Sequence, residues 1–156
     1  MKLIKSNKIK LVIGRKEKVD FPKLHLYDID AKIDTGAYTS AMDCQDIKVV
    51  TRNRTKKVSF KLRNIKHPYY FNKRFVYPIH SRKRIKSSFG HSEERYVIKT
   101  KIKIFDKLYD IELSLSNRDK MDYPVLLGRK ILKNNFLVDV NKINLSYRMK
   151  LKQKKE

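Results

Sequence analysis

The sequence has few of the residues that form several common kinds of site. Its one cysteine, Cys44, can form no disulfide within the chain, so we expect a reducing compartment. It has only four glycines and no G-x-x-x-x-G-K-[ST] motif, so no glycine-rich cradle for a nucleotide phosphate is expected. The four histidines form no H-E-x-x-H motif and no pair at metal-ligand spacing. We therefore expect neither a built-in zinc site nor a cofactor.

Long apolar runs are also missing. Lysines interrupt the apolar pairs of residues 1–10, so this segment lacks the continuous core of a signal peptide. No run elsewhere approaches the length of a membrane span. These patterns predict a cytoplasmic protein without membrane contact, built as a single domain over residues 1–149 with a solvated basic tail over residues 150–156.

Acidic residues are scarce as well. Thirty-nine Lys and Arg against sixteen Asp and Glu give a formal net charge of +23. Such a field attracts polyanions, either RNA and the ribosome or an acidic peptide such as a glutamate-rich tail. Alternatively, many lysines simply occupy the solvent-facing positions of strands, where they keep sheet edges soluble.

The most informative stretch that is present is Asp34-Thr35-Gly36-Ala37, which follows a predicted strand. Ile29, Ala31 and Ile33 alternate with polar residues, as in a half-buried strand, and glycine permits a tight turn directly afterwards. A carboxylate on such a rigid turn suits an aspartic peptidase, in which two facing carboxyl groups share a proton. A purely structural Asx turn uses the same residues, so D-T-G alone is weak evidence.

A second apolar strand ends in glycine further along the chain. Pro124-Val125-Leu126-Leu127 leads into Gly128 and Arg129, and residues 129–134 suit a short helix. Two period-two segments, residues 96–104 and 108–115, predict a β-hairpin with lysine on one face and isoleucine on the other. Further strands are predicted over residues 10–15, 24–33, 47–51 and 58–62.

Residues 64–92 show little alternation. They contain several aromatic residues and the basic run Arg82-Lys83-Arg84, and they exceed the usual length of a loop. Either this segment is a flap that covers a substrate, with Gly90 as a flexible point, or it is an insertion packed by its own aromatic side chains.

Several short motifs occur in a fixed order from about Lys10 to Asp139. They are Ile33-Asp34-Thr35-Gly36-Ala37-Tyr38-Thr39-Ser40-Ala41, Ser88-Phe89-Gly90-His91 with Glu94-Arg95-Tyr96-Val97-Ile98, Asn117-Arg118 with Met121, Leu126-Leu127-Gly128-Arg129, and Phe136-Leu137-Val138-Asp139. This series resembles the bacterial retropepsin-like family, long labelled ATP-dependent zinc proteases and associated with the ribosomal-protein glutamate ligase RimK. The resemblance implies an all-β, closed acid-protease barrel with one short helix near the C-terminus.

The resemblance also implies roles for particular residues. The catalytic turn would be Asp34, Thr35 and Gly36, and the flap or substrate-binding residues would be Ser88, Gly90 and His91. Structural support would come from Ala37, Thr39, Ser40, Gly128 and Arg129.

The chain contains a single D-T-G. Asp139 also lies on an apolar, strand-like run, but no Thr/Ser-Gly turn follows it. An aspartic dyad must therefore come from two copies, each contributing Asp34 across a two-fold axis. We expect a homodimeric aspartic endopeptidase that cleaves peptide or protein substrates. The competing interpretation is a noncatalytic module of the same fold that binds RNA or the ribosome.

Overall fold

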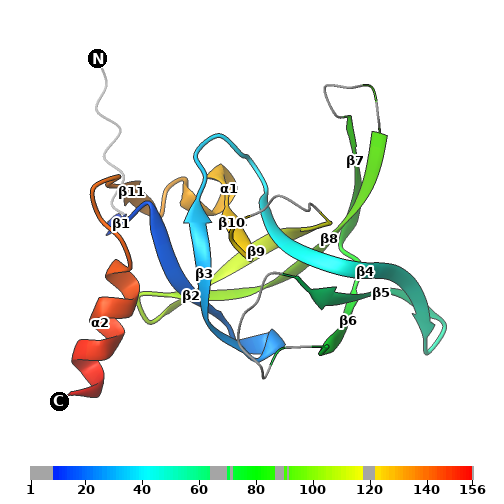
Figure 1. The fold of residues 1–156 in the computed structure, drawn as a ribbon, viewed down its shortest axis with the longest axis horizontal. Helices are drawn as coiled ribbons and strands as arrows, with labels where there is room; N and C mark the ends of the chain where they lie inside the picture. The colour runs from blue at the N-terminus through cyan, green and yellow to red at the C-terminus, as the bar shows by residue number, and fades with distance from the viewer. Residues whose placement is uncertain are drawn as a thin grey trace.

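The protein is described by a computed structural model, which covers residues 9–63, 70, 72–86, 90, 92–117 and 122–155. Strands dominate the fold (Figure 1). They are β1 (Leu11–Ile13), β2 (Lys16–Phe21), β3 (Leu26–Ile33), β4 (Ser40–Arg52), β5 (Thr55–Leu62), β6 (Arg74–Pro78), β7 (Ser81–Lys86), β8 (Ser92–Ile104), β9 (Lys107–Ser116), β10 (Val125–Leu127) and β11 (Phe136–Val138). A 3-10 turn (Pro22–Leu24) and two α-helices, α1 (Arg129–Leu132) and α2 (Leu145–Lys154), complete the described elements.

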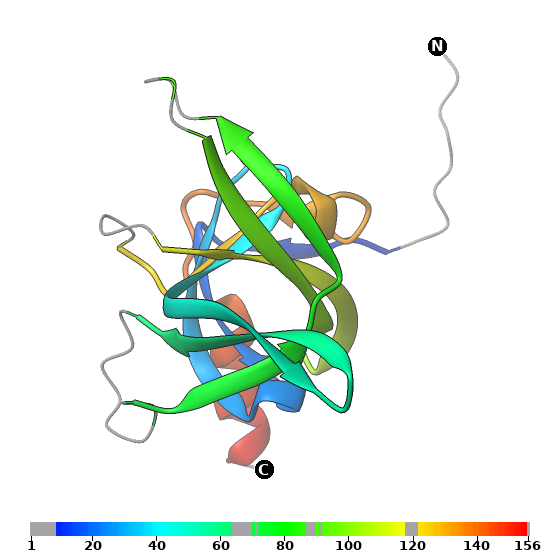
Figure 2. The ribbon, with the colours of Figure 1, turned by 90° about the vertical axis from the view of Figure 1, so that its right-hand side faces the viewer.

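The main sheet follows the order β10-β3-β2-β8-β9-β4-β5-β6, and β7 pairs with β8. The short strand β10 pairs with both β3 and β4. It therefore connects the two strands at opposite ends of the series β3-β2-β8-β9-β4. Figure 2 shows these strands wrapping around the interior of the molecule. β1 and β11 form a separate two-stranded parallel sheet. The mainly β architecture agrees with the fold class expected from the sequence.

The predicted hairpin is confirmed by the pairing of β8 with β9. Ile98, Ile102 and Ile104 are fully buried, whereas the intervening Lys99 is exposed. Burying an isoleucine side chain contributes roughly 1.5–3 kcal/mol, so this alternation fixes which face of the hairpin meets the core. The strands are joined by Phe105 and Asp106, both at positive φ, as a tight two-residue hairpin turn requires.

The segment 64–92 is more regular than the sequence indicated. It contains β6, which extends the sheet beyond β5, and β7, which pairs with β8. The sequence does not predict β7, because its residues Arg82, Lys83 and Arg84 are consecutive, exposed and polar. The strand therefore shows no alternation of apolar and polar residues. The predicted flap residues Ser88 and His91 lie outside the described residues.

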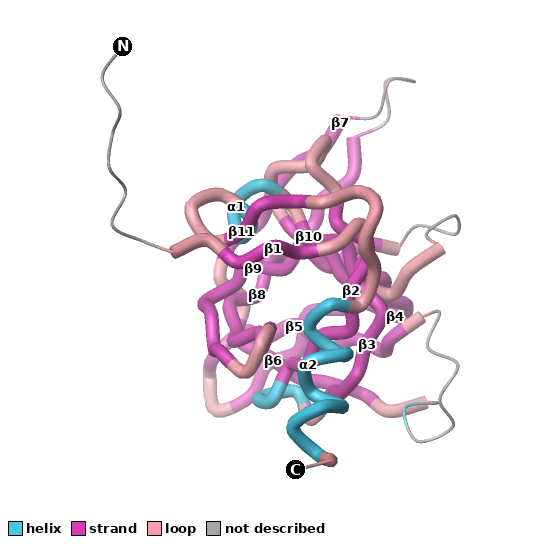
Figure 3. Tube along the Cα trace, turned by 90° about the vertical axis from the view of Figure 1, so that its left-hand side faces the viewer, coloured by secondary structure: helices cyan, strands magenta, loops and turns pink. Residues whose placement is uncertain are grey.

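The C-terminal part of the chain is more helical than the sequence indicated. α1 lies within the predicted helical segment, but a second helix, α2, runs through residue 154 and packs beside β2 (Figure 3). Glu17, fully buried, accepts hydrogen bonds from the backbone N–H groups of Gly14 and Ser146. The N-terminus of α2 is thus held by a side chain 129 residues away, which a local sequence pattern cannot reveal. Neither α1 nor α2 has the length and apolar character that a membrane-crossing helix needs.

Candidate active site

Asp34 stands at the end of β3, where the chain turns sharply. Its backbone N–H donates a hydrogen bond of 2.8 Å to the carbonyl oxygen of Leu127, which continues the parallel pairing of β3 with β10. The N–H of Gly36 donates to Oδ1 of Asp34 at 3.0 Å, and the N–H of Ala37 donates to the Asp34 carbonyl oxygen at 3.3 Å. The carboxylate is therefore oriented by its own turn, while its side chain remains partly open to solvent.

The turn is held from behind by Gly128. Its backbone N–H donates a buried hydrogen bond of 3.0 Å to Oγ of Ser40, at the start of β4. A Cβ atom at position 128 would lie 2.7 Å from the carbonyl oxygen of Tyr38 and 2.9 Å from that of Ala37. Because real Cβ contacts are not that short, glycine is what allows the two backbone segments to approach.

The first residues of α1 close this arrangement. The N–H groups of Arg129 and Lys130 donate to the carbonyl oxygens of Ala37 and Tyr38, at 2.8 and 2.9 Å. The Arg129 side chain donates from Nη1 to the carbonyl oxygen of Thr35 at 3.0 Å, and its guanidinium lies 5.9 Å from the centre of the Tyr38 ring. The start of α1 thereby fixes both the backbone and the exposed side of the Asp34 turn.

A contact from β7 reaches the same loop. Nζ of Lys83 donates to Oγ1 of Thr39 at 2.9 Å, which joins the β7–β8 hairpin to the residues that follow the D-T-G turn. Gly90, near the end of that hairpin, is exposed and has φ of 83°, a conformation that L side chains rarely adopt. The sequence analysis did not single out Lys83, because it lies in a run of three basic residues without a distinguishing pattern.

Two hollows flank the turn. One, of about 450 Å³, is lined by Thr35, Tyr38, Arg129, Leu132, Lys133, Phe136 and Val138. Next to it, Val12 and Leu137 are register partners in the β1–β11 sheet and are 46% and 55% exposed. Because strand side chains alternate, Phe136 and Val138 line the hollow from one face of β11, and Leu137 lies on the other face, so both faces carry apolar side chains.

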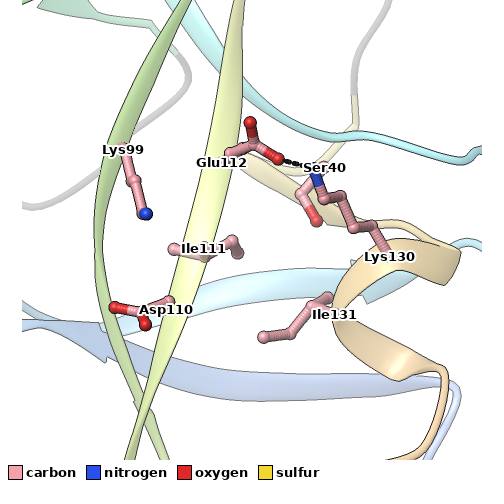
Figure 4. Close-up of a pocket in the computed structure, with 7 residues that line it drawn as sticks. All are labelled: Ser40, Lys99, Asp110, Ile111, Glu112, Lys130 and Ile131. Carbon is pink, nitrogen blue, oxygen red and sulfur yellow. Dashed lines mark hydrogen bonds and ion pairs between the residues drawn. The ribbon is translucent and has the colours of Figure 1, made fainter. Parts of the chain in front are cut away.

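The second hollow, of about 250 Å³, lies between β9 and α1 (Figure 4). Glu112 accepts a hydrogen bond from Lys130 and lies 2.8 Å from Nε2 of His80. This carboxylate therefore ties β9 both to α1 and to the segment between β6 and β7. Glu112 lies within the strand predicted over residues 108–115, but its two partners are distant in the sequence, so no local pattern indicates them.

The structure brings together Asp34, Thr35, Gly36 and all five residues expected to support them. Within the part of the chain that is described, Asp34 makes no hydrogen bond or ion pair with another side chain. Asp139 instead closes a separate turn, where its Oδ1 accepts from the N–H of Asn141. One copy of the chain thus supplies one carboxylate held on a rigid turn. Among the described positions, no cluster of three possible metal-ligating residues occurs.

A mainly β fold that carries a D-T-G turn on a strand end is the architecture of retropepsin-like aspartic peptidases. Residues 12–149 match the family model described as RimB-like, "Retropepsin-like aspartic endopeptidase RimB", and the chain belongs to this family.

Curated relatives carry a different description. A probable alpha-L-glutamate ligase of Desulfotalea psychrophila is 38% identical over 134 residues, and one of Shewanella pealeana is 39% identical over 130 residues. In each case the match covers 83% of this chain but 28% of the relative. The chain thus spans less than a third of the length of these relatives.

A solved structure supports the fold alone. The crystal structure of Lpg0085, a Legionella pneumophila protein of unknown function (DUF785), aligns with a TM-score of 0.69 at 24% identity. The alignment covers 88% of this chain and 99% of that one.

Proposed function

We propose that two copies of this chain form an aspartic endopeptidase of retropepsin type, with Asp34 of each copy facing the other across a two-fold axis. The main support for the proposal is the way in which the turn holds the Asp34 carboxylate. Its carboxylate is oriented by Gly36, braced by Gly128 and Arg129, and left open on one side. The six strands β10, β3, β2, β8, β9 and β4 would be the closed barrel of this fold, within a single domain over residues 1–149.

The surface beside the turn supports assembly. Val12 and Leu137 present apolar side chains to solvent, and the apolar-lined hollow opens next to Thr35. Exposed apolar surface of this kind is commonly covered by a partner. In an isologous dimer the same surface meets itself, so covering the hollow beside Thr35 with a second copy would also bring the two Asp34 turns together.

The chemistry follows from two carboxyl groups in close proximity. They cannot both ionise cheaply, so the pair holds one proton. The ionised Asp34 removes a proton from a water molecule, whose oxygen attacks the carbonyl carbon of the peptide bond. The protonated Asp34 donates to the carbonyl oxygen, which gives a tetrahedral intermediate. The Asp34 that took the proton from water then passes it to the amide nitrogen, and the carbon–nitrogen bond breaks. A hydroxyl of the intermediate gives its proton to the other Asp34 as the new carboxyl group forms, so the pair again holds one proton.

Acidic peptides, including glutamate-tailed ribosomal proteins, are the proposed substrates. The net charge of +23 would enrich them, and Lys83 and Arg129 place cations beside the turn. The relatives named as probable glutamate ligases contain a segment similar to this chain, which links the family to glutamate chemistry. The β7–β8 hairpin, with Ser88, Gly90 and His91, would be the flap over the substrate. We place this activity in the cytoplasm and without a cofactor.

The test compares Asp34→Asn with Asp139→Asn in a peptidase assay on a mixed peptide library that includes glutamate-rich members. Asn keeps the turn but removes the titratable group, so cleavage should fall by roughly 10²- to 10⁴-fold or more. Asp139→Asn preserves the acceptor oxygen of a turn outside the site and should retain activity. Equal cleavage by the parent and Asp34→Asn, or no cleavage by the parent, would favour the noncatalytic RNA- or ribosome-binding alternative.

A further inference from the structure

Positive charge is concentrated in one part of the chain. Residues 47–92 contain fourteen Lys and Arg and no Asp or Glu. Elsewhere, some lysines on strands pair with carboxylates, as Lys18 does with Asp30 and Lys101 with Asp110. The excess charge of the protein is therefore unevenly distributed, and the segment that carries it forms the end of β4 together with β5, β6 and β7.

The outer part of β4 and the whole of β5 form a long hairpin that extends away from the Asp34 turn (Figures 1 and 2). One face of this hairpin belongs to the core, because Val58, Phe60 and Leu62 are buried. Since strand side chains alternate, Lys57 and Lys61 point to the opposite, outer face. The outer face is where the charges accumulate.

The strand register places those charges at regular intervals. Arg52 pairs with Thr55, Val50 with Lys57, Lys48 with Ser59, and Gln45 with Lys61. Each of these four pairs thus contributes one cation. We call Lys48, Arg52, Lys57 and Lys61 the cationic ladder. Alternate strand positions are about 7 Å apart, so the ladder extends over roughly 20 Å, with a register shift between Gln45 and Lys48.

None of the four side chains of the cationic ladder forms an ion pair with a residue that the structure describes, and Lys48 and Arg52 are exposed. The neighbouring carboxylate, Asp46, already pairs with Arg74 of β6. The hydrogen bond from Arg74, helped by the nearby charges of Lys48 and Lys61, lowers the pKa of Asp46, which therefore stays ionised and occupied by Arg74.

We propose that the cationic ladder binds the phosphodiester backbone of a nucleic acid strand laid along the outer face of the β4–β5 hairpin. The ladder spacing is close to the separation of successive phosphates in an extended strand. An acidic peptide fits this face less well. A peptide that gains affinity by adding a strand would bind at a sheet edge, such as the edge of β4 beyond Asp43, and not on the face that carries the four cations. Phosphates require only the cations.

The site is separate from the proposed peptidase centre. Lys48, Arg52, Lys57 and Lys61 make none of the contacts that hold the Asp34 turn. Binding should therefore be independent of Asp34. It should also be insensitive to base sequence and should weaken steeply with salt, because contacts to phosphates release counterions.

The experiment measures binding of a fluorescein-labelled 20-nucleotide single-stranded RNA, and of DNA of the same sequence, by fluorescence anisotropy over a series of salt concentrations. The ladder variant replaces Lys48, Arg52, Lys57 and Lys61 with Gln. The matched control replaces the exposed Lys107, Lys142, Lys152 and Lys154 with Gln, so both proteins lose the same total charge. Thermal unfolding by circular dichroism verifies that both variants fold, and a polyglutamate peptide of similar charge serves as competitor.

We expect the ladder variant to lose about tenfold or more in affinity for both strands, with the slope of log K against log salt reduced by as much as ~3. The control variant and Asp34→Asn should bind close to the parent. Three results would overturn the proposal: no binding by the parent, equal losses in the ladder and control variants, or polyglutamate that displaces the strand at lower concentration than unlabelled RNA. If the ladder variant fails to fold, the single variants Lys48→Gln and Arg52→Gln, both at exposed positions, replace it. Each should lower the affinity for both strands, and parental affinity in both single variants would overturn the proposal.

Discussion

Oγ of Ser40 accepts a hydrogen bond from the backbone N–H of Gly128 at 3.0 Å, and this buried contact joins the strand that follows the Asp34 turn to the strand that ends beside it. The two residues are 88 positions apart in the chain. Their contact explains why two glycine-terminated strands, far apart in sequence, can build one rigid loop.

Replacing Ser40 with Ala should leave the Gly128 N–H buried without its acceptor. An unsatisfied buried donor costs about 1–3 kcal/mol, so we expect a loss of that size in the free energy of unfolding, measured by urea denaturation. Ser114→Ala is the control, because Oγ of Ser114 is buried without a hydrogen-bond partner among the described residues. If Ser114→Ala were the more destabilising of the two, the assigned role of Ser40 would be wrong.

Gly128→Ala should disturb the turn more directly. The new Cβ would press on the carbonyl oxygens of Ala37 and Tyr38, which are backbone atoms that cannot swing away. We expect lower thermal stability and a reduced kcat in the peptidase assay. In contrast, a Cβ at Gly90 meets nothing within 4 Å, and Asn tolerates positive φ, so Gly90→Asn should leave the unfolding temperature nearly unchanged.

Lys83→Met tests whether β7 serves substrate capture. Removing this cation beside Thr39 should raise KM for an acidic peptide more than for a neutral peptide of equal length, with little change in kcat. Added salt should reproduce the effect in the parent protein, because screening weakens capture more than chemistry. Lys107→Met, at the remote β8–β9 turn, should change neither value. Equal rises in KM for both peptides would contradict the electrostatic role.

Cys44 should be inert in the folded protein. Burial, together with the neighbouring charge of Asp43, raises the pKa of its thiol well above the usual value. A raised pKa keeps the thiol protonated, so little of the reactive thiolate forms as pH rises through the range in which an exposed cysteine ionises. Reaction with a disulfide reagent at pH 8 to 9 should be slow in the native state and fast in urea. Rapid native labelling would contradict the buried placement.

The parts of this fold that the sequence predicts are those in which local patterns and burial agree. The alternation of Ile and Lys in β8 marks its buried face, and the glycines after Thr35 and Leu127 mark the two ends that meet at the site. In each case the signal lies within a few residues of the structure it specifies.

The rest depends on contacts between distant residues. α2 has no apolar stripe, and its attachment rests on Glu17 at its first turn and on Lys150, which pairs with Asp20 and Asp28. Likewise, the link from Lys83 to Thr39 joins residues 44 positions apart. Hydrogen bonds and ion pairs of this kind leave no periodic pattern, so neither the second helix nor the contact from β7 to the turn could be read from the chain.

The central claim is that each active unit needs an Asp34 from two copies, and subunit mixing tests it most directly. Parent protein is equilibrated with a ninefold excess of Asp34→Asn, and the cleavage rate is compared with that of the same amount of parent alone. If random exchange forms dimers, most parent chains acquire an inactive partner, and activity should fall to about a tenth. Asp139→Asn at the same excess should cause no such loss. Full activity in the presence of excess Asp34→Asn would show that one chain is catalytic by itself and would contradict the account.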